Sequence, residues 1–239
     1  MNFIVLRRLA LIVLSVLCVF ASVAGLVRTS QRIYAESVPV FSPVQEEETV
    51  VRLPVMLSDS CVVAERLVAY SGTFVEDGTD REVENVAALR IYNAGEEMLP
   101  FFRITLVIQG KLLQFEGSCL PSGSAMLLQE MYATTYVPGE ISSVMIRVYD
   151  GSCWDYDGEL IAWETYMGGI KLHNLSQQTL HEVYIYHKNY LAEQNLYLGG
   201  ATYITFVPDL EAGEKRNVWP ARWCEENKII AISIRKDTP

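Results

Sequence analysis

The chain has 239 residues, half of them hydrophobic and a fifth charged, and its formal net charge is −10. This hydrophobic fraction is too high for an intrinsically disordered protein, and the length is sufficient for one or two folded cores. The acidic balance repels phosphate backbones, and no run rich in lysine and arginine opposes that repulsion. Composition therefore excludes nucleic acid as a partner.

The N-terminus carries a targeting signal. Arg7 and Arg8 precede an uncharged, mostly apolar run from Leu9 to Val27. As a helix, this run extends roughly 28 Å, close to the thickness of the hydrocarbon core of a bilayer. We expect residues 1–27 to anchor the chain in the cell membrane, with its C-terminal part outside. A signal peptide cleaved after Ser22-Val23-Ala24, which would release a secreted protein, is one alternative, and a buried helix is another.

Residues 28–49 follow the apolar run as a tether. They contain Pro39, Pro43 and the run Glu46–Glu48, without a sustained hydrophobic period. Prolines stiffen such a segment, and neighbouring like charges extend it. We expect a solvated stalk.

Two later stretches repeat one pattern. Leu89–Asn93 matches Ile170–Asn174, and each copy continues through an alternating apolar segment to a Leu-x-x-Gly turn. The turns are Leu120–Gly123 and Leu210–Gly213. A repeat of this kind predicts two similar modules in tandem.

The apolar period of these modules is that of β-strands. In residues 101–108 and 144–148 apolar and polar side chains alternate, which is typical of half-buried strands. We therefore predict an all-β fold of two immunoglobulin-like β-sandwich modules, residues 50–149 and 159–239. Residues 150–158, rich in Asp and Gly, are the expected linker.

The repeated pattern resembles the FxLYD family of small immunoglobulin-like modules in extracytoplasmic proteins of Gram-positive bacteria. The similar features are a strand that ends in Asn93 or Asn174, and the later turn at Leu120–Gly123 or Leu210–Gly213. The resemblance covers most of residues 86–234, without the Phe-x-Leu-Tyr-Asp signature itself. It implies an immunoglobulin-like fold at the cell envelope, and it implies no particular chemistry.

Four cysteines follow the apolar run: Cys61, Cys119, Cys153 and Cys224. In an exported chain an even number allows two disulfides, with three possible connectivities. We favour pairs within the modules, Cys61–Cys119 and Cys153–Cys224, and unpaired buried thiols are the alternative. The cysteine and histidine spacings do not match a zinc site.

Catalytic and metal-binding patterns are missing from the sequence. The three histidines, His173, His181 and His187, accompany neither a Gly-x-Ser-x-Gly turn nor a metal-ligand spacing. The acidic turns at Glu76–Glu82 and Asp155–Glu159 do not complete a calcium loop, so we expect solvated turns there. The sequence predicts no enzyme, no cofactor and no metal, with a site assembled only in three dimensions as the alternative.

Aromatic residues of the second module give the one indication of binding. Tyr184 and Tyr186 alternate with apolar residues and are expected to face outward. Tyr190 and Tyr197 lie around Lys188–Gly200, where the second copy is nine residues longer than the first. Exposed aromatics stack on sugars or anchor protein partners, unless a second layer or the neighbouring module covers them.

From these features we predict a non-enzymatic cell-envelope protein whose modules serve protein–protein interaction or assembly. The alternative is binding of carbohydrate or cell-wall glycan through Tyr184, Tyr186, Tyr190 and Tyr197. The expected partners are an envelope protein or a glycan, together with the membrane through the N-terminal helix.

Overall fold

The computed structural model describes residues 50–57, 60–149 and 159–234. Within these ranges the chain consists of β-strands, turns and one short 3-10 helix, so the prediction of an all-β fold is confirmed. The predicted N-terminal helix (1–27), tether (28–49) and linker (150–158) lie outside the described residues. No helix in the described part of the chain is long and apolar enough to span a membrane.

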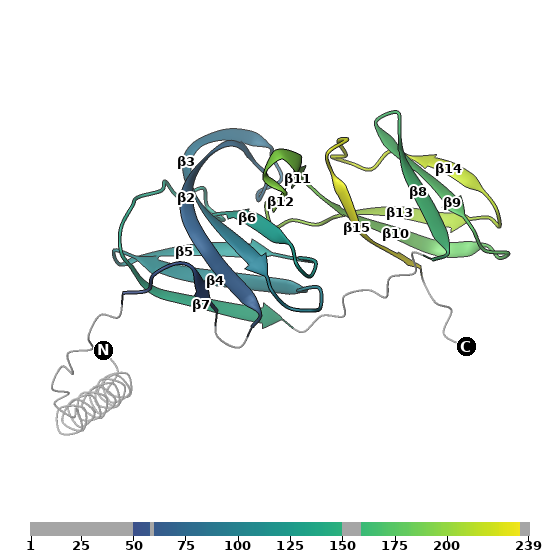
Figure 1. Ribbon diagram of the computed structural model, residues 1–239. Helices are drawn as coiled ribbons and strands as arrows, with labels where there is room; N and C mark the ends of the chain where they lie inside the picture. The colour runs from purple at the N-terminus through teal and green to yellow at the C-terminus, as the bar shows by residue number, and fades with distance from the viewer. Residues whose placement is uncertain (1–49, 58–59, 150–158, 235–239) are drawn as a thin grey trace, which may run out of the picture. The chain divides into compact units, whose positions relative to one another are not determined.

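Seven strands form the N-terminal half, which we define as the described residues between 50 and 149 (Figure 1). They are β1 (Val55–Met56), β2 (Val62–Phe74), β3 (Arg81–Asn93), β4 (Phe101–Ile108), β5 (Lys111–Gly117), β6 (Ala125–Gln129) and β7 (Ile141–Tyr149). Strands β1, β2, β3 and β6 lie side by side in one sheet, and β5, β4 and β7 form the other. Neighbouring strands among these seven are antiparallel.

The C-terminal half, residues 159–234, repeats this strand order (Figure 1). Its sheets consist of β8 (Ile161–Tyr166), β9 (Gly169–Asn174), β10 (Leu180–Lys188), β13 (Tyr203–Leu210), β14 (Lys215–Val218) and β15 (Lys228–Ile234). The order β8-β9-β14 corresponds to β2-β3-β6, and β13-β10-β15 corresponds to β5-β4-β7. The repeat in the sequence is therefore a repeat of strand pairing.

An insertion distinguishes the second copy. Between β4 and β5 the chain reverses at Gln109 and Gly110, whereas between β10 and β13 it forms a hairpin. This joint hairpin consists of β11 (Tyr190–Leu191), the 3-10 helix η1 (Ala192–Gln194) and β12 (Leu196–Leu198). Strand β12 pairs in parallel with β6, so the hairpin extends a sheet of the N-terminal half (Figure 1).

Each half has its own hydrophobic core. In β4 the buried residues alternate with partly exposed ones, as the sequence predicts, because one face of the strand packs inward. The N-terminal core joins Phe102, Ile104 and Phe115 of one sheet to Leu89 and Ile91 of the other. The C-terminal core combines residues of both its sheets: Ile161, Ile170, Leu172, Leu180, Val183, Ile185, Val207, Leu210 and Ile232. In both halves, packing between two sheets buries the apolar face of each strand.

The repeated asparagine and the repeated turn meet in both halves. The Asn93 side-chain amide donates to the carbonyl oxygens of Glu97 (2.9 Å) and Leu120 (3.0 Å), and its oxygen accepts from the Gly95 amide. The buried Asn93 thus fixes the end of β3 to the Leu-x-x-Gly turn.

Asn174 makes the equivalent contacts in the second copy. It donates to the carbonyl oxygens of Gln178 (2.8 Å) and Leu210 (2.9 Å), and it accepts from the amide of Ser176 (2.8 Å). Only a side chain with both a donor and an acceptor satisfies these buried backbone groups at once. The repeated motif is therefore a hydrogen-bonded lock within each half.

Candidate functional site

Tyr190 and Tyr197, two of the four predicted binding residues, lie in the joint hairpin. They are 9% and 7% exposed and pack against the core of the N-terminal half. Their rings meet edge to face, with 5.3 Å between centroids, and the Nζ atom of Lys228 lies 3.4 Å from the centroid of the Tyr190 ring. The neighbouring half covers both tyrosines. From the sequence alone, this coverage is the alternative to outward exposure.

Tyr184 and Tyr186 lie elsewhere, on β10, and differ in exposure. Tyr186 is 3% exposed, whereas Tyr184 is partly exposed and its ring centroid lies 5.2 Å from that of Phe206. Ile204 and Phe206 on the adjacent β13 are each more than half exposed. The outward apolar surface here, which we call the outer patch, therefore consists of Tyr184, Ile204 and Phe206.

A buried lysine is the main polar feature where the two halves meet. Lys188, the last residue of β10, has no exposed surface. Its ammonium group donates to the carbonyl oxygens of Ser118 (2.9 Å), Gly200 (2.9 Å) and Ala201 (2.8 Å), and it lies 3.1 Å from the Thr202 hydroxyl. Because Ser118 belongs to the N-terminal half, the ammonium group connects the two halves.

Glu76 completes this connection from the N-terminal side. Its carboxylate follows β2 and accepts from the backbone amides of Gly200 (3.0 Å) and Gln129 (3.1 Å). Gly200 thus donates its N–H to Glu76 while its carbonyl accepts from Lys188. One peptide segment of the C-terminal half therefore lies between an acidic and a basic group.

The segment passes so close to the N-terminal half that it requires glycine. A Cβ atom on Gly200 would lie 1.8 Å from the backbone oxygen of Glu116, and one on Gly199 would lie 2.1 Å from Val75. Gly199 also has a φ of +74°, which side chains disfavour. Close packing between the halves is therefore the reason for the glycine pair.

Burial determines the protonation equilibria in this site, which we call the joint cluster (Glu76, Lys188 and Cys119). It raises the pKa of Glu76 to about 7 and lowers the pKa of Lys188 to about 8, since each charged form loses water. Burial also raises the pKa of the Cys119 thiol. Lys188 and Glu76 each bind backbone groups of the other half or its linking segment, and these contacts hold the two halves together.

A hollow of about 380 Å³ lies beside the joint hairpin. Residues of both halves line it, and Arg222 crosses it to pair with Asp80 at 2.8 Å. Near it lies the buried His187, whose pKa burial lowers to about 4. The ring of His187 meets that of Trp223, with 5.3 Å between centroids. No group of three metal-ligating side chains occurs in the described ranges.

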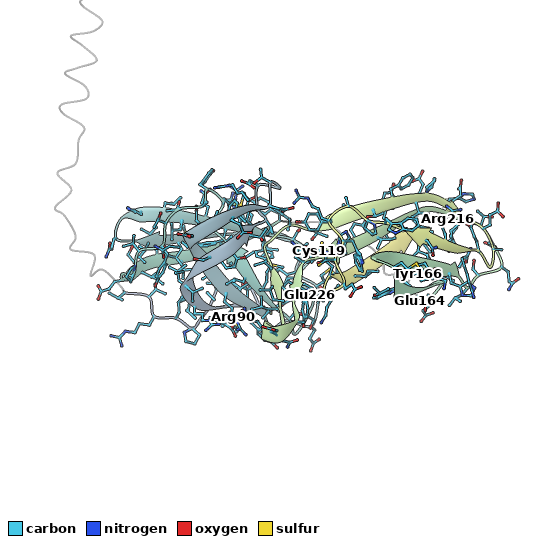
Figure 2. The ribbon with its side chains drawn as sticks, turned by 90° about the horizontal axis from the view of Figure 1, so that it is seen from above. Arg90, Cys119, Glu164, Tyr166, Arg216 and Glu226 are labelled. Carbon is cyan, nitrogen blue, oxygen red and sulfur yellow. The ribbon has the colours of Figure 1, made fainter. Side chains whose placement is uncertain are left out.

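The described cysteines are free thiols, so the predicted Cys61–Cys119 pair is not formed. Cys61 is exposed beside Gly95. Cys119, which Figure 2 shows where the two halves meet, is buried near Lys188 and Thr202. Cys224 lies in the segment that lines the hollow. Cys153, and with it the predicted Cys153–Cys224 pair, lies outside the described residues.

The first acidic turn is held by internal contacts. Asp77 accepts from the Thr79 amide at 2.9 Å and pairs with Arg81 at 3.1 Å on the exposed part of the turn. The expectation of a solvated turn is wrong for Glu76, because its carboxylate lies in the joint cluster and binds the Gly200 and Gln129 amides. His181 pairs with Asp209 at 2.6 Å on the exposed face of its strand. Most of the second acidic turn lies outside the described residues.

Sequence reasoning missed Lys188, Glu76, Ile204 and Phe206. A lysine or glutamate normally reads as exposed, and no local pattern marks the exceptions. The sequence did carry a signal for Ile204 and Phe206, because they lie on the face of β13 opposite to the buried Val207.

Comparison with known protein families, curated proteins and solved structures finds no match to this chain.

Proposed function

We propose that this chain is a non-enzymatic cell-envelope protein that presents two immunoglobulin-like modules for protein–protein interaction or assembly. The observation that carries the proposal is the joint hairpin. The insertion that distinguishes the second copy pairs with the first half through β12 and β6. The inserted segment thus holds one module against the other.

The strand order supports the immunoglobulin-like part of the proposal. In each half a β2-β3-β6 type sheet packs on a β5-β4-β7 type sheet across one core. Two antiparallel sheets with inward alternation are the architecture of such sandwiches. The apolar N-terminal run supports attachment to the envelope, either through an anchor or after export by a signal peptide.

The outer patch supplies a place to test for partners. Ile204 is 55% and Phe206 is 52% exposed, and they neighbour Tyr184. Exposed apolar groups that gather on one sheet face are typical of interaction surfaces. We expect a partner protein to contact this patch in the native envelope.

Photo-crosslinking in cells that express the full-length chain tests the proposal. A photoreactive phenylalanine analogue in place of Phe206 should yield a discrete covalent adduct with another protein. The same analogue in place of Leu112, an equally exposed residue of β5, is the matched control and should yield none. Absence of any protein adduct at position 206 would contradict the proposal.

A second candidate function is binding of cell-wall glycan. The tilted pair of Tyr184 and Phe206 favours it, because adjacent exposed rings can stack on a sugar. The double change Tyr184→Ala with Phe206→Ala should abolish binding to purified peptidoglycan. Tyr132→Ala, which removes a 77% exposed ring of the N-terminal half, should leave that binding unchanged.

A further inference from the structure

Equivalent strand pairs in the two halves carry different side chains on the same outer face. Tyr92 of β3 pairs with Ala125 of β6, and in the second copy His173 of β9 pairs with Lys215 of β14. One pleat further along, Leu127 corresponds in the same way to Asn217 of β14. The registers agree, so differences between the two faces are differences of chemistry and not of geometry.

In the N-terminal half this face is apolar and its edge is closed. Ala125 and Leu127 are each 7% exposed and pack with Leu196 and Leu198 of the joint hairpin. Strand β12 occupies the free edge of β6 by parallel pairing, with Leu198 opposite Leu127. This half therefore shows what the edge accepts, namely a short extended strand.

In the C-terminal half the equivalent edge is open. Strand β14 is the end strand of its three-stranded sheet in the described part of the chain. Lys215 and Asn217 are exposed on it. An end strand presents unpaired amide and carbonyl groups to any extended segment that can lie along it.

A hollow lies on the outer face of this sheet and extends from β8 across β9 to Lys215 of β14. The hollow measures about 200 Å³, and its charged or titratable lining residues are Lys171, His173, Lys215 and Glu164. Glu164 pairs with Lys171 at 2.8 Å. Lys215 forms no ion pair within 4 Å of a described residue, but its charge helps to lower the pKa of Glu164. Figure 2 shows Glu164 in the C-terminal half, away from Cys119 at the joint. In a chain of net charge −10, this surface is locally basic.

We propose that the open edge of β14 and its basic hollow form a docking site for an extended acidic segment of a partner protein. The segment adds in parallel to β14, as β12 adds to β6, and places carboxylates over Lys215 and His173. Backbone pairing supplies the affinity, and Lys215 selects acidic side chains. This proposal rests on the interaction function proposed above and gives it a surface and a partner chemistry.

The test uses purified full-length protein and a labelled synthetic peptide of alternating valine and glutamate. Valine favours an extended strand, and alternation directs every glutamate to one face. We expect saturable binding that weakens as salt rises, because exposed charges are screened. The change Lys215→Glu should weaken binding about tenfold, which is a loss of about 1.4 kcal/mol. Lys111→Glu, an exposed lysine in the N-terminal half, is the matched control and should change nothing.

Two further peptides separate strand addition from simple charge attraction. A valine–lysine peptide should not bind, and a valine–glutamate peptide with N-methylated central amides should bind at least about fivefold more weakly. Equal binding of either peptide would overturn the proposal, as would unchanged affinity of Lys215→Glu. If the peptide fails while the crosslink at Phe206 persists, the docking site is wrong and the interaction function stands.

Discussion

At the scale of single residues, the two asparagine locks explain why short motifs recur in a chain with little other internal identity. Asn93 is 2% exposed and Asn174 is fully buried, and each serves backbone groups of two different turns. A buried carbonyl or amide without a partner costs about 1–3 kcal/mol, so the asparagine cannot be exchanged for an apolar residue without loss. The requirements of folding alone therefore constrain these two positions, whether or not they take part in function.

The change Asn93→Ala tests the lock. It leaves the carbonyl oxygens of Glu97 and Leu120 and the amide of Gly95 without their partner. We expect the free energy of unfolding, measured by urea denaturation, to fall by about 2–3 kcal/mol. Asn217→Ala removes an exposed asparagine of β14 and should change it by less than about 0.5 kcal/mol. A loss of similar size in both variants would show that Asn93 does not act as a lock.

At the scale of elements, the joint hairpin is too short to be stable alone. Strand β11 has two residues and β12 has three, and an isolated two-stranded hairpin is at best marginal in water. Pairing with β6, burial of Tyr190 and Tyr197, and the contacts of Lys188 and Glu76 hold it in place. The stability of the hairpin therefore depends on the neighbouring half.

The change Gly200→Ala should separate the hairpin from that half. The added Cβ would meet the Glu116 carbonyl oxygen at 1.8 Å, so the segment must move away. We expect hydrogen exchange to become faster at the amides of β6 and β12, and unchanged at those of β9. Gly110→Ala is the matched control: it has open space and φ +72°, so it should cost about 1 kcal/mol and leave exchange in β6 and β12 protected. Protection retained in Gly200→Ala would refute the close-packing argument.

The sequence predicted the elements better than their contacts. Alternation placed Phe102, Ile104 and Leu106 inward correctly, because that period reflects one sheet face. The longer second copy around Lys188–Gly200 was identified as the place of divergence, but three residues of β12 carry no periodic signal. Their pairing with β6 joins segments far apart in the chain, which no local pattern encodes.

The same limit applies to the site. Alternation assigns Tyr186 to the outward face of its strand. It does not reveal that the other module covers this end of β10. Lys188 illustrates it further, since only the meeting of two halves supplies the carbonyl groups that its ammonium needs. Side-chain environments created between halves are properties of tertiary structure.

At the scale of the whole molecule, the joint cluster makes the stability of the contact between the halves depend on pH. Burial raises the pKa of Glu76 from 4.5 to about 7, so the folded state holds this proton more tightly than the unfolded state. Its contribution is most favourable below about pH 4.5 and is lost as pH rises to about 7. The pKa of Lys188 falls from 10.5 to about 8, so its cost is full below about pH 8 and declines up to about pH 10.5. Between about pH 7 and 8 the folded state therefore bears the full cost of burying both charged groups.

The change Glu76→Gln isolates the acidic part of this behaviour. Glutamine keeps the size of the side chain and an oxygen that accepts from Gly200, but it cannot ionise. Relative to this variant, the wild-type free energy of unfolding should fall by about 1–2 kcal/mol between pH 5 and 8 and then stay level. This figure allows for screening, since Glu76 is only partly shielded from water. Glu84→Gln, at an exposed position of β3, should follow the wild-type curve, and parallel curves for the wild type and Glu76→Gln would contradict the assignment.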